Sequence, residues 1–175
     1  MRSLEEQITQ YAAYHRDRRN IATHFVGIPM IVFSIVLALA VIRAPLGITN
    51  TSVAVVVAAV TAVYYLKLDL VLGLTMTAYL ALNCFLAHEL VAAIGTINAL
   101  WTALVVFVVG WVLQFWGHKF EGMKPAFFDD LMGLVIGPLF VMTEVFFMLG
   151  LKPKLKQYVE ARVGPVVAKR VHQTA

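Results

Sequence analysis

Three histidines lie in two polar stretches that are far apart in the sequence. His15 and His24 belong to residues 14–29 (YHRDRRNIATHFVGIP), and His118 belongs to residues 114–122 (QFWGHKFEG). Neutral imidazoles bind iron, zinc or copper, and carboxylates complete such coordination shells. These residue types therefore indicate a metal site, provided that the fold brings the two stretches together.

The spacing within each stretch determines which side chains can share that site. Asn20 and His24 are four residues apart and lie on one face of a helix. Gln114, His118 and Glu121 follow at intervals of four and three, so they also share a face if their helix extends that far. Asn20 and Gln114 are therefore candidate catalytic residues beside the metal.

The spacing of His15 and His24 requires a bend in the chain. They are nine residues apart, and at about 100° per residue they point to opposite sides of one straight helix. If both bind one ion, the chain bends within residues 16–20 (RDRRN); otherwise His15 has another role. A carboxylate from Asp129 or Glu121 would complete the shell.

The composition indicates which elements position these residues. The chain has 175 residues, of which 61% are hydrophobic and 14% are charged. This composition is typical of an integral membrane protein, and the length fits one all-α domain over residues 1–175. The net charge is +4, but the basic residues adjoin apolar stretches, which excludes a nucleic-acid partner and favours contact with membrane lipids.

Residues 1–25 are predicted as an interfacial helix, and residues 152–175 as a basic tail. Between them, residues 26–151 are predicted to form a helical bundle. Its apolar stretches are 26–42, 52–66, 70–87, 97–116 and 131–151. The first four are predicted to be full spans. The fifth contains Gly137 and Pro138 at its centre, which favours a broken or re-entrant helix over a plain fifth span.

The distribution of charge predicts the orientation. Lysine and arginine gather in the N-terminal segment, the 117–130 loop and the C-terminal tail, whereas residues 44–51 and 88–96 contain neither. By the positive-inside rule, the first three segments are cytoplasmic. A complete fifth crossing would place the tail on the other side, which is a second reason to favour a broken helix.

Other charged residues have both a functional and a structural interpretation. Glu144 lies within the fifth apolar stretch, where an ionisable group is costly and marks a candidate catalytic residue. The alternative is a packing contact with Thr143 or a tyrosine. Arg16, Arg18 and Arg19 are predicted to meet anionic head groups, or one of them to bind the carboxylate of an acidic lipid.

Two blocks of the sequence resemble the small membrane family of the fungal 2-hydroxy fatty acid dioxygenase. The first is His15-x4-Asn20-x3-His24 with the later Pro29. The second begins at Gln114-Phe115-x-Gly117-His118 and continues through Glu121, Pro125, Asp129, Pro138, Glu144 and Leu149-Gly150. Residues 44–110 match in hydropathy alone. The resemblance implies an Fe(II)-dependent dioxygenase that shortens a 2-hydroxy fatty acid by one carbon, with iron bound by the three histidines.

The sequence thus supports two main hypotheses. The first is a membrane-embedded Fe(II)-dependent dioxygenase that uses O₂ and a fatty-acid-type substrate. Its metal ligands would be His15, His24, His118 and either Asp129 or water. The alternative is a non-enzymatic lipid-binding or scaffold protein whose histidine cluster is structural. A transporter is disfavoured because the sequence contains no inverted repeat.

Overall fold

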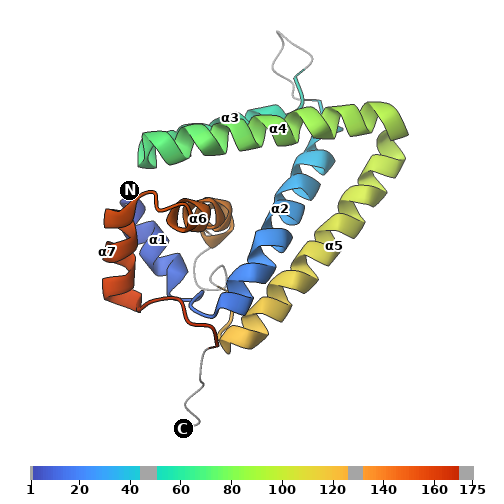
Figure 1. The fold of residues 1–175 in the computed structure, drawn as a ribbon. Coiled ribbons are helices and arrows are strands. Elements are labelled where there is room, and N and C mark those ends of the chain that lie inside the picture. The colour runs from blue at the N-terminus through green and yellow to red at the C-terminus, as the bar shows by residue number, and fades with distance from the viewer. Residues whose placement is uncertain (1, 44–50, 126–131, 170–175) are drawn as a thin grey trace. The chain divides into compact units, whose positions relative to one another are not determined.

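The computed structural model describes residues 2–43, 51–125 and 132–169. Within these ranges the chain forms seven α-helices, drawn in Figure 1, which confirms the predicted all-α class. The helices are α1 (Leu4–Ala12), α2 (Arg18–Ala40), α3 (Val53–Leu68), α4 (Leu70–Ile94), α5 (Thr96–Glu121), α6 (Met132–Met148) and α7 (Pro153–Val163).

The chain divides into two compact units. One consists of Met1–Ile28 and Trp111–Ala175, and therefore holds α1, α6, α7, the first turns of α2 and the last turns of α5. The other is Pro29–Gly110, with α3, α4 and the remainder of α2 and α5. The single domain expected over the whole chain stays a prediction.

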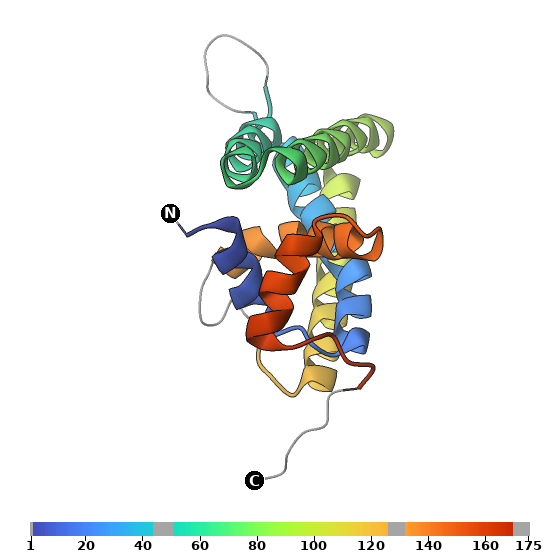
Figure 2. The same ribbon diagram turned by 60° about the vertical axis from the view of Figure 1, so that its left-hand side comes forward.

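In the unit Pro29–Gly110, α3 and α4 lie side by side in both Figures 1 and 2. The turn between them is tight because Gly73 packs on the backbone of Leu66, where a Cβ atom would come within 2.6 Å of the Cα. Asp69 caps α4 by accepting a hydrogen bond from the amide of Leu72 (2.9 Å). The buried core of this unit is rich in alanine, and small side chains let helices approach closely.

In the other unit, α1 packs against α6 and α7. α1 begins with a capping box, in which Ser3 and Glu6 satisfy each other's backbone amides. Its buried face includes Ile8 and Tyr11, and Phe140 of α6 contacts the Tyr11 ring at a centroid distance of 4.9 Å. These contacts fix the end of α1, from which the chain turns into the candidate site.

The predicted break at Gly137 and Pro138 is wrong, because α6 continues through both residues. Gly137 instead makes room for the Tyr11 hydroxyl, which would lie 2.9 Å from a Cβ atom at that position. The bend, of 112°, lies between α6 and α7. Gly150 has a φ of 73°, and the Leu151 amide donates to the Phe146 carbonyl (2.8 Å), which is the Schellman arrangement that ends a helix.

Three of the described helices, α2, α4 and α5, are long and apolar enough to cross a membrane. The bent pair of α6 and α7 would be a fourth, and α3 is a shorter apolar helix of 16 residues. The prediction of several apolar helices is thus confirmed, although α2 begins at Arg18 rather than near residue 26. It begins early because its first polar residues, including Asn20 and His24, are buried within their own unit.

Candidate metal centre

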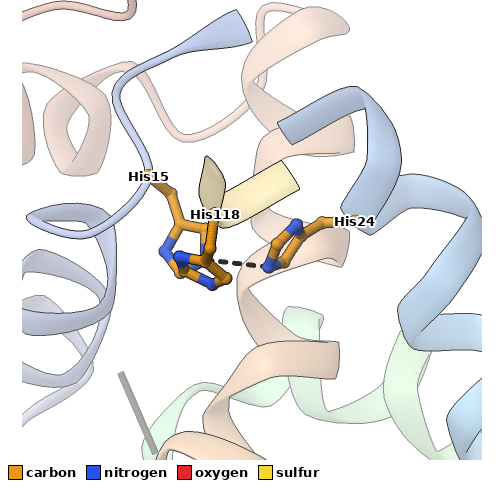
Figure 3. A group of neighbouring side chains, drawn as sticks. All are labelled: His15, His24 and His118. Carbon is orange, nitrogen blue, oxygen red and sulfur yellow. Dashed lines mark hydrogen bonds between the residues drawn. The ribbon is translucent and has the colours of Figure 1, made fainter. Parts of the chain in front are cut away.

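The three histidines of the two polar stretches converge, as predicted. His15 lies in the turn between α1 and α2, His24 in α2, and His118 near the end of α5 (Figure 3). The ring centroids are 4.5 to 5.0 Å apart, and the three rings are buried. One nitrogen from each ring lies within 4.8 Å of the other two, which is the arrangement of side chains around a shared ion.

The hydrogen bonds of His15 and His24 fix which nitrogen carries the proton. His15 Nδ1–H donates to the Tyr11 carbonyl (2.7 Å), and His24 Nδ1–H donates to the Asn20 carbonyl (2.9 Å). Because a carbonyl oxygen only accepts, the Nε2 atom of each neutral ring keeps a lone pair. The dashed line in Figure 3 joins these two Nε2 atoms, which are 2.9 Å apart.

The donor set fits a transition metal ion. Two facing lone pairs repel each other unless a proton or a cation lies between them. A metal–imidazole bond is about 2.1 Å long, so two nitrogens on one ion are about 3 Å apart, close to the spacing of the two Nε2 atoms. His118 adds a buried Nδ1 that has no hydrogen-bond partner in the described part of the chain. Hydrogen bonds from metal-bound imidazoles to carbonyls are the usual outer-shell arrangement.

The bend required for His15 and His24 to meet is present. α1 ends at Ala12, and the amide of His15 donates back to the Ala12 carbonyl (3.0 Å). α2 then begins at Arg18, after Asp17, whose carboxylate accepts the Arg19 amide (2.9 Å) as an N-cap does. The bend predicted for residues 16–20 thus falls at their first two members, before α2 begins.

Glu121 holds this turn in place. Its carboxylate accepts the backbone amides of Arg16 (2.9 Å) and Asp17 (2.9 Å) and the side-chain amide of Asn20 (3.0 Å). Glu121 is 1% exposed, so water does not compete for these bonds. The sequence offered Glu121 as a possible ligand, whereas in the structure both of its oxygens bind the segment that carries His15.

Of the candidate catalytic residues, Asn20 and Gln114 lie beside the centre. Asn20 is buried, and its side-chain amide also donates to the Tyr14 carbonyl (3.2 Å). Gln114 lies one turn before His118 on α5 and is 5% exposed. The Oδ1 atom of Asn20 and the Nε2 atom of Gln114 are buried without hydrogen-bond partners in the described ranges. The centre therefore has an acceptor and a donor available nearby.

Gly117 allows α5 to approach α2 at this point. A Cβ atom at Gly117 would overlap Thr23 Oγ1 and come within 2.5 Å of Asn20 Oδ1. We expect Gly117→Ala to lower the free energy of unfolding by about 1–3 kcal/mol, because overpacking displaces α2. Thermal unfolding with and without metal tests this. Adding Thr23→Ala should recover part of the loss, and full stability of the single variant would contradict the close approach.

The environment of His15 alters its protonation. Burial, followed by the neighbouring imidazoles of His24 and His118, lowers the pKa of His15 well below its ordinary value of 6.5. The ring of His15 stacks on Tyr11 at a centroid distance of 4.3 Å and contacts Phe140 on another side. His15 is therefore neutral at physiological pH and has its lone pair available to bind a metal ion.

This shift predicts a pH dependence of stability for the metal-free protein. In the unfolded chain His15 takes up a proton as the pH falls through about 6.5, whereas the folded state resists protonation. The contribution to stability is therefore complete above pH 6.5 and is lost as the pH falls toward the lower folded pKa, by up to about 1.4 kcal/mol per pH unit. We expect the melting temperature to fall between pH 7.5 and 5.5, and to fall less in His15→Gln. Equal slopes would contradict the assignment.

Glu144 lies outside the group of three histidines. It is a buried residue of α6 whose Oε1 atom is 3.7 Å from Arg16 Nη2. Both residues line a cavity whose described walls include none of the three histidines. Asp129, predicted as a fourth ligand, lies outside the described residues.

The sequence did not indicate the role of the segment after α7. The Val167 amide donates to the Arg16 carbonyl (2.8 Å), and the Arg18 amide donates to the Val167 carbonyl (2.9 Å). Arg16 Nη1 also donates to the Gly164 carbonyl (3.0 Å). Part of the predicted basic tail thus braces the turn that holds His15. The residues Gly164 to Val167 (GPVV) carried no signal for that contact.

Comparisons with known proteins find a family model and a relative that each cover most of the chain, and the family model's match includes all three histidines. The model of the family described as 2-hydroxy-palmitic acid dioxygenase Mpo1-like matches residues 1–149. The chain is 32% identical over 160 residues to 2-hydroxy-palmitic acid dioxygenase MPO1 of Saccharomyces cerevisiae, which covers 90% of this chain and 87% of that protein. No solved structure matches.

Proposed function

The chain belongs to the family of 2-hydroxy-palmitic acid dioxygenase Mpo1-like proteins, and we propose that it is a membrane-embedded, Fe(II)-dependent dioxygenase that shortens 2-hydroxy fatty acids by one carbon. The similarity to a named fatty acid dioxygenase supports the reaction class. The observation that carries the metal dependence is the pair of Nε2 atoms of His15 and His24, which lie 2.9 Å apart with His118 beside them.

The three histidines would hold the iron. When bound there, Fe(II) would supply redox chemistry with O₂ next to the C1–C2 bond of the substrate. Three protein ligands leave coordination positions open, as in other non-haem iron oxygenases. Asp129 is proposed as a further ligand, and water is the alternative.

The protein's own residues would orient and shield the reaction. Asn20 fixes the His24 ring through its carbonyl, and its Oδ1 atom, which has no partner among the described residues, would accept a hydrogen bond from a substrate hydroxyl. The Nε2 atom of Gln114, likewise without a partner in the described ranges, would donate to a substrate oxygen. Tyr11 and Phe140 cover the His15 ring, which keeps water from that side of the centre. Holding substrate in this way contributes to the rate through orientation.

Metal analysis and turnover on the purified protein test the proposal. The protein would be purified in detergent, loaded with Fe(II) under anaerobic conditions and assayed for iron and for the shortened product from 2-hydroxypalmitate and O₂. We expect about one iron per chain and turnover that needs both iron and O₂. Failure to bind iron, or conversion that is independent of iron, would refute the proposal.

The scaffold alternative predicts a different result. If the histidines only packed helices together, the protein would be stable without metal and the melting temperature would not respond to Fe(II). A metal ion that binds only the folded state raises the free energy of unfolding. When the metal is in excess, this rise follows the logarithm of the ratio of the free metal concentration to the dissociation constant. A rise of the melting temperature with Fe(II) therefore supports the metal centre over a structural cluster.

The location in the membrane is part of the proposal. The apolar helices α2, α4 and α5 support membrane embedding, and the predicted orientation places the N-terminus, the 117–130 loop and the tail in the cytoplasm. Because Cys84 is the one cysteine of the sequence, a Cys84→Ala chain gives a clean background for labelling. We expect Ser3→Cys to react with a membrane-impermeant thiol reagent only after the cells are permeabilised. Reaction in intact cells would refute this orientation.

A further inference from the structure

A half-open cavity of about 470 Å³ lies in the same unit as the histidines. It is bounded by the first turns of α2, the end of α6, α7 and the segment after α7. Its walls are largely apolar, with Ile21 and Phe25 from α2 and Phe147 from α6. Ligand-binding cavities commonly have this size and combine apolar walls with a few polar groups.

The polar end of the cavity carries a loosely made ion pair. Arg16 Nη2 and Glu144 Oε1 are 3.7 Å apart, which is longer than a hydrogen bond, although both side chains are largely buried. The Arg16 Nε atom donates to the carbonyls of Ala12 and His15, so the guanidinium is held against the ligand-bearing turn. The charge of Arg16 is therefore fixed in position while its ion pair with Glu144 is not optimal.

The remaining charges of the cavity favour an anion. Arg18 and Lys156 also line it, as does Glu160, which lies 4.0 Å from Lys156. The described walls of the cavity thus carry three cationic and two anionic side chains. An amphiphile with one negative head group and an apolar chain complements this lining.

The cavity lies close to the histidine centre along α6. Glu144 and Phe140 are four residues apart and share one face of α6. The Phe140 ring contacts the His15 ring at a centroid distance of 5.3 Å. The charged end of the cavity is therefore about one helical turn, or roughly 6 Å along the axis, from a residue that contacts a metal ligand.

We propose that this cavity receives the carboxylate end of the fatty acid as it enters from the membrane, with Arg16 exchanging Glu144 for the carboxylate of the acid. The naming of the acid rests on the proposed function. Glu144 then acts as the counter-charge of Arg16 while the cavity is empty and selects against neutral lipids, because only an anionic head competes for the guanidinium. Ile21, Phe25 and Phe147 contact the first carbons of the chain.

Photolabelling of the metal-free protein tests this binding directly. The probe is 2-hydroxypalmitate with a diazirine near the carboxyl end, applied to the full chain in lipid nanodiscs. We expect saturable labelling of peptides from residues 21–25, 147–148 and 159–166. Unlabelled 2-hydroxypalmitate should compete, whereas its methyl ester should compete about tenfold less or worse, because a charge-assisted contact is lost.

Variants separate a binding role for Glu144 from a structural one. Glu144→Gln should tighten labelling about threefold to tenfold, because the competing carboxylate is removed. Phe25→Trp should weaken binding of the probe about tenfold, because the larger ring fills part of the cavity. Phe85→Trp, on the exposed surface of α4, is the matched control and should leave it unchanged. If Glu144 had a purely structural role, Glu144→Gln would instead leave the probe concentration for half-maximal labelling unchanged or raise it.

The proposal is overturned if labelling falls outside the cavity, if the ester competes as well as the acid, or if Glu144→Gln fails to tighten binding. Equal competition by hexadecyl phosphate would overturn the assignment to the substrate carboxylate and indicate a general site for anionic lipids. Because the protein is metal-free, these results are independent of iron content and turnover. A failure to detect the proposed reaction would therefore not contradict binding in the cavity. A failure to detect binding in the cavity would likewise not contradict the proposed reaction.

Discussion

Replacing His118 with alanine is expected to remove iron from the protein and to reduce turnover to background. His118 is the candidate ligand that lies on α5, and its buried Nδ1 has no hydrogen-bond partner in the described part of the chain. Loss of an outer-shell partner alone costs about 10- to 100-fold in metal affinity, so loss of a ligand should cost more than about a hundredfold. Iron per chain, measured by elemental analysis after desalting, checks the first expectation, and product formation checks the second.

The stability of the same variant separates a metal centre from a packing cluster. In the metal-free protein His118→Ala leaves a cavity whichever role the ring has, so the informative quantity is the rise of the melting temperature with Fe(II), which we expect this variant to lose. His88→Ala is the matched control, because His88 lies on α4, donates to the Cys84 carbonyl (2.6 Å) and is not a member of the three-histidine group. Full iron content in His118→Ala, or a melting temperature of this variant that rises with Fe(II) as much as that of the unsubstituted protein, would contradict the metal assignment.

The meeting of the two polar stretches was predictable from the sequence. Residue type made the three histidines candidate ligands, and the distribution of apolar stretches allowed the start of α2 and the end of α5 to meet. The nine-residue spacing of His15 and His24 then required a bend, and the structure has one before Arg18. Helical periodicity is a strong constraint of this kind because it acts within a single segment.

Contacts between distant backbone segments were not predictable in this way. Glu121 was a candidate ligand because carboxylates accompany histidines in metal sites, yet its oxygens accept the amides of Arg16 and Asp17. No periodicity in the sequence reveals that an irregular turn 104 residues away exposes two parallel amides. The bracing of the same turn by Val167 was missed for this reason as well.

The position of the break in the last apolar stretch shows how tertiary packing overrides local propensity. Gly137 and Pro138 disfavour a helix interior, but α6 passes through them because Gly137 accommodates the Tyr11 hydroxyl. The true end of α6 has its own local signal in Gly150 and Pro153, a positive-φ glycine followed by a proline at the start of the next helix. Both signals were present in the sequence, and only the packing of α1 distinguishes them.

Replacing Glu121 with alanine is expected to have the second largest effect, on both stability and metal content. Three buried donors, the amides of Arg16 and Asp17 and the side chain of Asn20, would lose their acceptor. Each unsatisfied buried donor costs about 1–3 kcal/mol, so for three donors we expect a loss of at least about 3 kcal/mol in the free energy of unfolding. Because the released turn carries His15, iron affinity should fall by about 10- to 100-fold. Thermal unfolding and equilibrium iron titration measure the two effects.

The comparison with Glu121→Gln distinguishes an anchor from a ligand. A glutamine at position 121 keeps one oxygen acceptor but places an NH₂ donor against a backbone amide. If Glu121 only holds the turn, Glu121→Gln should therefore show intermediate losses of stability and iron affinity, and high free Fe(II) should restore iron occupancy. A ligand predicts the opposite pattern, in which metal-free stability is kept in both variants and iron is lost equally from both. Iron loss without any change in the metal-free melting temperature would therefore show that Glu121 binds the metal rather than the turn, and that the chain rearranges when iron enters.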